Sequence, residues 1–142
     1  MIGFGAGGAA LLFLAGSASA GEAPLFGEWA RGDGKALVRF EPCGSAVCAV
    51  NTWIKPGTAD EKVGDKLVLN VSPSGASVLT GEAFDPQRNM TLRMRMEVGA
   101  ATMTTHGCVL GGLICDGETW ARAAQATTGA GQGLARSYCP QR

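Results

Sequence analysis

The sequence carries little charge and no excess of either sign. Its 142 residues include twelve acidic and twelve basic side chains, so the formal net charge is zero at pH 7. Binding to nucleic acid or to an anionic membrane usually depends on a basic excess. We therefore expect no nucleic-acid partner.

Residues suited to hydrolytic chemistry are also scarce. His106 is the only histidine, and no Gly-x-Ser-x-Gly element is present. Triad catalysis needs a base beside a nucleophile and an orienting acid. The acidic residues Glu82, Asp85 and Glu97 show no spacing typical of an acid–base pair. The sequence thus predicts a protein that is not an enzyme and that uses no cofactor.

Hydrophobic patterns of helical length are missing, and short alternating segments stand in their place. In residues 88–98 every second side chain is Met, Leu or Val, and the residues between them are polar. A period of two is that of a strand with one buried face. Strands are predicted at residues 24–31, 35–41, 47–54, 66–71, 76–84, 88–98, 101–106 and 117–122. This spacing predicts an all-β fold, a small antiparallel up-and-down β-barrel of about eight strands.

The first twenty residues have the pattern of a signal peptide. They lack charged side chains, contain an apolar core at residues 9–15 and end in Ala18-Ser19-Ala20. We expect cleavage before Gly21 and no transmembrane anchor afterwards, in a periplasmic or secreted bacterial protein. Residues 21–122 would then form the barrel domain, and residues 123–142 a flexible tail rich in Ala, Gly and Thr.

Five cysteines indicate a disulfide framework. Cys43 and Cys48 bracket a predicted four-residue turn, and a two-residue Gly-Gly turn would set Cys108 opposite Cys115. In an exported chain both pairs are expected to be disulfides, with Cys139 left over. The alternative is a zinc site of four cysteines, but the Cys-x6-Cys spacing fits zinc poorly. We expect no metal.

Several short motifs resemble those of a known family. They are Gly27-x-Trp29, Gly34-Lys35, Pro42-Cys43-Gly44 with Cys48, Trp53-Ile54-Lys55 and Trp120-x-Arg122. They are similar to motifs of the exported bacterial proteins grouped as domain-of-unknown-function family 2147, over roughly residues 26–122. The resemblance implies a lipocalin-like, or calycin, barrel with no established activity. It also implies that Arg122 lies across the ring of Trp29 and closes the barrel. Between Lys55 and Asp65 the chain departs from the family's longer, Arg-rich stretch.

The methionines on two successive strands indicate what fills the barrel. Eight strands leave an interior that is either filled or able to hold one small ligand, and flexible Met side chains adapt to varied ligands. The predicted pocket residues are Val38, Leu67, Leu69, Met90, Leu92, Met94, Met96 and Met103. Simple core filling is the plain alternative, and a copper site of Met94, Met96 and His106 is a third.

The sequence therefore predicts an exported, non-enzymatic binding protein for a small, largely apolar or amphiphilic ligand. A fatty acyl chain would lie among the Met residues, with its head at the mouth near Arg93, Arg95 or Lys66. The alternative is an interaction module with a filled barrel. Such a module would use the uncharged hairpin of residues 109–114 to bind a protein, whose identity the sequence does not give, or the cell envelope.

Overall fold

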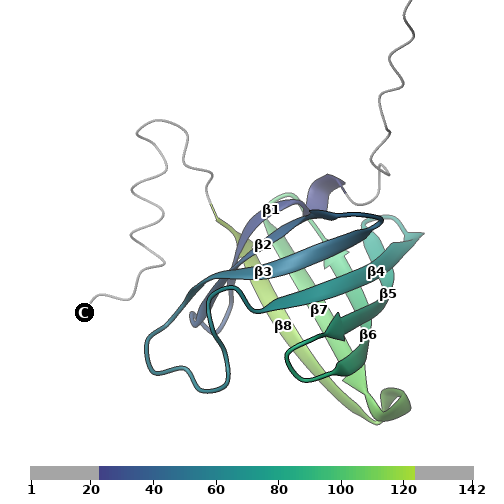
Figure 1. Cartoon of the computed structure of the whole chain (residues 1–142). Helices are drawn as coiled ribbons and strands as arrows, with labels where there is room; N and C mark the ends of the chain where they lie inside the picture. Colours follow the sequence, from purple (N-terminus) through teal and green to yellow (C-terminus); the bar gives the residue numbers. More distant parts are fainter. Residues whose placement is uncertain (1–22, 124–142) are drawn as a thin grey trace, which may run out of the picture.

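Eight antiparallel strands close into a barrel in the computed structural model, which describes residues 23–123 (Figure 1). The strands are β1 (Gly27–Arg31), β2 (Ala36–Cys43), β3 (Ala46–Ile54), β4 (Lys66–Gly75), β5 (Val78–Asp85), β6 (Met90–Val98), β7 (Thr102–Val109) and β8 (Ile114–Arg122). Two single turns of 3₁₀ helix, η1 (Ala23–Leu25) and η2 (Leu110–Gly112), accompany them. The predicted all-β barrel of eight strands is confirmed.

Each strand pairs with the next, and β8 returns to β1. Trp29 lies opposite Arg122, and Arg31 lies opposite Trp120. Closure leaves no strand of the barrel at a free edge, and it gives every strand one inner and one outer face. On β6, Met96 and Val98 are buried, whereas Arg93 and Arg95 are exposed on the outside.

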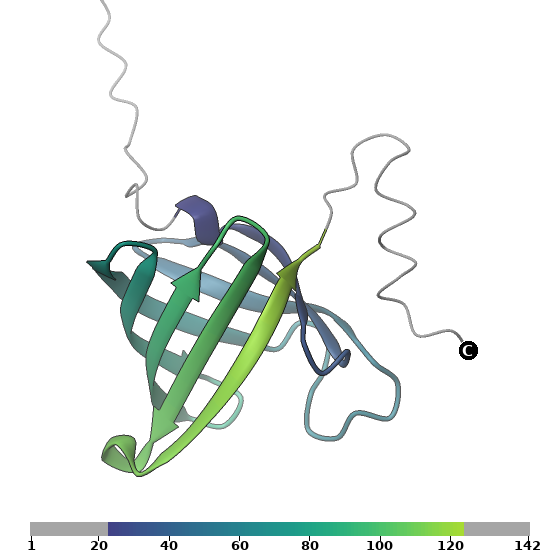
Figure 2. The ribbon, with the colours of Figure 1, turned by 180° about the vertical axis from the view of Figure 1, so that it is seen from behind.

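The two ends of the barrel differ. At one end β1 begins and β8 ends, and η1 lies beside them, whereas the η2 tip lies at the opposite end (Figures 1 and 2). The tightly packed core gathers near η1, where Leu25, Trp29 and Met96 are fully buried and Met103 is nearly so. We call this the closed end and the other end the mouth.

Prolines did not end the strands where the sequence suggested. The strand predicted at residues 35–41 extends further, and Pro42 lies within β2 opposite Val47. β1 accompanies β2 only as far as Phe40, so one side of β2 has no neighbour there and a missing N–H is tolerated. The strand predicted at residues 66–71 is also too short. β4 continues to Gly75 through an irregularity after Pro73, where the register shifts.

Both predicted disulfides are formed, Cys43–Cys48 and Cys108–Cys115. These sulfurs are bonded to each other, so the zinc alternative is wrong. The turns differ from the prediction, however. The β2–β3 turn contains only two residues, since Cys43 already pairs with Ala46, and the disulfide joins diagonal neighbours across the hairpin.

The hairpin between β7 and β8 has a four-residue loop in place of the predicted Gly-Gly turn. Cys108 does lie opposite Cys115, as predicted. η2 fills the loop, and Leu110, Gly111 and Gly112 all have positive φ, a conformation that two glycines make accessible. The expected signal peptide, the tail beyond Ala123 and its cysteine lie outside the described residues. Within residues 23–123 no helix is long and apolar enough to cross a membrane.

Candidate functional site

The barrel contains a cavity of about 520 Å³ that opens at the mouth. Its inner part is apolar, whereas charged side chains surround the opening. The apolar lining consists of Val38, Phe40, Ala49, Leu67, Leu69, Met90, Leu92, Met94, Met96 and Trp120. Ligand cavities commonly have this volume and this mixture of apolar walls with a few polar groups.

Seven of the eight pocket residues predicted from the sequence line this cavity; the eighth, Met103, is buried in the core instead. Three apolar residues of the lining were missed, namely Phe40, Ala49 and Trp120. Phe40 shares the inner face of β2 with Val38, so the period-two pattern already contained that signal. Trp120 lies two residues before Arg122 on the inner face of β8, where the same pattern applies.

An aromatic pair forms part of the cavity wall. The rings of Phe40 and Trp120 meet edge to face, with centroids 6.1 Å apart. The indole N–H of Trp120 donates to Oγ1 of Thr105 across the neighbouring strand, at 3.0 Å. This bond satisfies the polar atom of the indole and fixes its plane, leaving an aromatic surface toward the cavity.

The closed end is held by Arg122 and Trp29. The guanidinium carbon of Arg122 lies 4.1 Å from the centre of the Trp29 ring, a cation–π contact. The Arg122 guanidinium also donates to three backbone carbonyls, those of Pro24, Phe26 and Ala100. The Trp29 indole N–H donates to the carbonyl of Leu25 at 2.8 Å. This end of the barrel is therefore sealed and lies away from the cavity opening.

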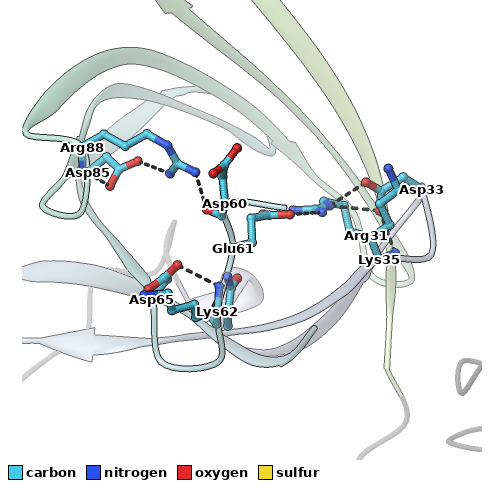
Figure 3. A network of polar contacts seen from close by, with 10 residues as sticks. Arg31, Asp33, Lys35, Asp60, Glu61, Lys62, Asp65, Asp85 and Arg88 are labelled. Atoms are coloured by element: carbon cyan, nitrogen blue, oxygen red, sulfur yellow. Dashed lines mark hydrogen bonds and ion pairs between the residues drawn. The ribbon is translucent and has the colours of Figure 1, made fainter. Parts of the chain in front are cut away.

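A loop crosses the mouth. Residues 55–65 connect β3 to β4, and we call them the strap. Figure 3 shows Asp60 and Glu61 of the strap between two arginines from other parts of the chain, Arg31 of β1 and Arg88 of the β5–β6 turn. Arg31 at the end of β1 makes a bidentate contact with Glu61, with N–O distances of 2.6 and 2.8 Å. On the opposite side, Arg88 in the β5–β6 turn donates to the carbonyl of Asp60 at 2.7 Å.

Each of these arginines is also held on its own side of the mouth. Nε of Arg31 contacts the carboxylate of Asp33 at 3.0 Å, and Nη1 of Arg88 contacts that of Asp85 at 2.8 Å. Asp85 is buried and also accepts hydrogen bonds from Gln87. The arginines are thus positioned before they reach the strap, and the strap is fastened at two points.

The electrostatics of the mouth favour the charged forms of these groups. The hydrogen bonds from Arg31 hold the pKa of Glu61 below its ordinary value, and burial opposes them only in part. Burial would raise the pKa of Asp85, but the bonds from Arg88 and Gln87 outweigh it and lower that pKa. Contact with Glu61 raises the pKa of Arg31. Both strap contacts are therefore between ionised or strongly polar groups near neutral pH.

Two groups considered from the sequence lie elsewhere. Arg93 and Arg95 point outward, and Arg95 pairs with Glu97 on the outer wall, so the expectation that they meet a ligand head is wrong. Lys66, in contrast, does line the cavity. His106 is exposed opposite Arg95, whereas Met94 and Met96 point inward, so the copper alternative is not assembled. Residues 23–123 contain no cluster of three His, Cys, Asp or Glu side chains suited to a metal.

The tip of the β7–β8 hairpin is apolar and exposed. Leu110, Leu113 and Ile114 are 69%, 85% and 58% exposed, next to the Cys108–Cys115 disulfide. Figure 2 shows this tip projecting beyond the rest of the barrel. It does not cover the cavity, because none of these side chains belongs to its lining.

Comparisons with known proteins place the chain in one family. No curated protein and no solved structure matches it. A family model does match, over residues 27–122, which run from the first residue of β1 to the last residue of β8. The chain therefore belongs to DUF2147, a family described as uncharacterized proteins conserved in bacteria.

Proposed function

We propose that this protein is an exported, non-enzymatic binding protein that holds a small, largely apolar ligand inside its barrel. The observation that carries the proposal is the cavity of about 520 Å³, with apolar walls and a polar mouth. Such a volume accommodates a drug-sized or single-chain lipid-like molecule. The methionines of β6 line one wall, and their flexible side chains adjust to ligands of different shape.

The strap supports the same function. A ligand that enters a deep barrel has to pass the loop that crosses the mouth. At its centre, residues 60 and 61, the strap is held by the side chains of Arg31 and Arg88, whereas backbone hydrogen bonds to Lys35 and Asn51 hold its two ends. The centre can therefore be released without breaking strand pairing. A loop held in this way combines retention of a ligand with exchange.

Export and the absence of catalysis are parts of the proposal. The two disulfides favour an oxidising compartment such as the periplasm. His106, the only histidine of the sequence, lies on the outer face of β7 and not at the cavity, so a triad based on histidine is not part of the proposal. The function is therefore binding, with the cavity rather than a reactive group at its centre.

A neutral fluorescent probe tests the proposal directly. N-phenyl-1-naphthylamine becomes bright when it leaves water, so it should bind the wild-type protein saturably. Met94→Trp adds a bulky ring to the cavity wall and should abolish or strongly weaken binding. Thr91→Trp, which places the same ring on the exposed outer face of β6, is the matched control and should bind like wild type. Absence of saturable binding to the wild type, or equal binding by all three proteins, would contradict the proposal.

The exposed tip favours a second function, that of an interaction module at the cell envelope. Three large apolar side chains on one hairpin loop are uncommon without a partner. Leu110→Asp with Leu113→Asp should reduce co-purification with envelope fractions while leaving probe binding intact. Unchanged fractionation would remove this candidate and leave the cavity as the functional site.

A further inference from the structure

The charge around the cavity is unbalanced, and this imbalance indicates which class of ligand the cavity takes. The inference rests on the binding function proposed above. The lining includes three cationic side chains, Arg31, Lys66 and Arg88. It includes twice as many carboxylates, those of Asp33, Glu61, Asp65, Asp85, Asp116 and Glu118. The chain as a whole is neutral. The negative excess is thus a property of this opening and not of the composition.

Ion pairing accounts for half of these carboxylates. Arg31 is shared by Asp33 and Glu61, and Arg88 is paired with Asp85. Among the described residues, Asp65, Asp116 and Glu118 have no basic partner within ion-pairing distance. Each accepts a single hydrogen bond from a nearby backbone N–H, of Lys62, Gly117 and Thr119 respectively. Three carboxylates at the cavity opening thus have no ion pair among the described residues and keep acceptor positions available for a ligand.

Two of these carboxylates lie on the same strand as an aromatic wall. Asp116, Glu118 and Trp120 alternate along β8, so their side chains share its inner face. Trp120 in turn packs against Phe40 at the apolar part of the cavity. From inside to outside, this strand therefore presents an aromatic surface and then two acids. An aromatic face next to a carboxylate is the combination that attracts an organic ammonium group.

We propose that the cavity takes an amphiphile with a cationic head, an alkylamine or alkylammonium. Its chain lies among Met90, Met94 and Met96, and its ammonium group lies against Glu118 and Asp116. A fatty acid is disfavoured, since its carboxylate would meet a rim that already has excess negative charge. The two arginines at the rim are occupied by their own acids, and Arg93 and Arg95 are on the outside. Lys66 is the one cation of the lining without an ion pair among the described residues, and three carboxylates without ion pairs outnumber it.

The test compares three ligands with the same chain and different heads. Dodecylammonium, dodecanoate and neutral dodecanol are each titrated as competitors of N-phenyl-1-naphthylamine bound to the wild-type protein, below the concentrations at which micelles form. We expect dodecylammonium to bind at least about tenfold more tightly than dodecanoate, because nearby charges at a partly exposed site each contribute several-fold. The preference should weaken with added salt.

Two double variants test which carboxylates cause the preference for the cationic head. Asp116→Asn with Glu118→Gln should remove most of the preference for the cation and leave dodecanol binding unchanged. Glu82→Gln with Glu97→Gln makes the same change in charge on the exposed outer wall, and it should keep the preference. Melting curves of both variants show whether each is folded, and dodecanol binding shows whether the cavity is intact.

The outcomes separate this inference from the binding function. If dodecanol binds and dodecanoate binds as well as dodecylammonium, the cationic head is wrong and the binding function stands. If the preference survives in the Asp116 and Glu118 variant, the assigned residues are wrong. If neither the probe nor any of the three ligands binds the wild type, the binding function itself is overturned.

Discussion

The two ends of the barrel are both fastened by arginine, but with different partners. At the closed end Arg122 donates to backbone carbonyls and stacks on Trp29. At the mouth Arg31 and Arg88 bind carboxylates, and through them and the Asp60 carbonyl they hold the strap. One residue type thus builds a permanent seal at one end and fastens a loop at the other, where Figure 3 shows Arg31 and Arg88 beside the strap.

The groups that the arginines bind determine how the stability of each end depends on pH and salt. Carbonyls do not titrate, and a cation–π contact on a buried ring depends little on pH. Carboxylates titrate, and contacts between partly exposed ions are weakened by salt and acid. The closed end should therefore contribute a constant stability. The strap should make a smaller contribution to stability, and this contribution should change with pH and salt. Such a dependence suits the end through which a ligand would pass.

The largest effect is expected from the closed end. Trp29 is fully buried in the core, and its indole N–H bonds the Leu25 carbonyl. Trp29→Ala should lower the free energy of unfolding by about 3–5 kcal/mol, because it leaves a large cavity. Chemical denaturation followed by circular dichroism measures it. A loss below that of the strap variant described last would contradict the division of the barrel into a rigid and a releasable end.

Arg122→Ala should have the next largest effect. The substitution removes the cation–π contact, worth about 0.5–2 kcal/mol, and leaves three carbonyls without their donor. The control is Arg93→Ala, which removes an exposed guanidinium from the outer wall of the same barrel and should change the melting temperature little. Equal losses in the two variants would show that the stacked arginine is not what seals this end.

Much of the barrel could be predicted from the sequence because its signals are local. Strand β6 alternates strictly, and its inner face supplied four of the predicted pocket residues that line the cavity, Met90, Leu92, Met94 and Met96. The disulfides were predictable because each closes a hairpin. The turns were less so, since the β7–β8 loop depends on Leu110 adopting a positive φ, which few residues of its type do.

The strap and its fastenings could not be predicted for a different reason. Arg31 and Glu61 are 30 residues apart, and Arg88 and Asp60 are 28 apart. Neither spacing follows from a strand period or a turn type; both result from the closure of the barrel, which brings β1 and the β5–β6 turn to opposite sides of one loop. The charged mouth is likewise a product of closure, because its acids come from four separate parts of the chain, the β1–β2 turn, the strap, the end of β5 and β8.

The smallest effect, and the sharpest test of the comparison, concerns Glu61. Glu61→Gln removes the bidentate contact with Arg31 and should cost about 1 kcal/mol near neutral pH, as befits a partly exposed pair. In the folded protein the bonds from Arg31 hold the pKa of Glu61 below its ordinary value. The stabilisation is therefore complete above that ordinary value, about 4.3, and is lost as pH falls through the folded value.

The melting temperatures of wild type and Glu61→Gln should accordingly differ at pH 6–7 and converge as acid lowers the pH through the depressed folded pKa of Glu61. Arg122→Ala provides the contrast. Its deficit relative to wild type should stay nearly constant over the same range, because its partners are carbonyls and an indole ring. Neutral-probe dissociation should be faster from Glu61→Gln than from wild type at pH 7, since the strap then has one fastening in place of two. Suppose that acid removed the difference in melting temperature between wild type and Arg122→Ala but left that between wild type and Glu61→Gln intact. The expected pH dependence of the two ends would then be wrong.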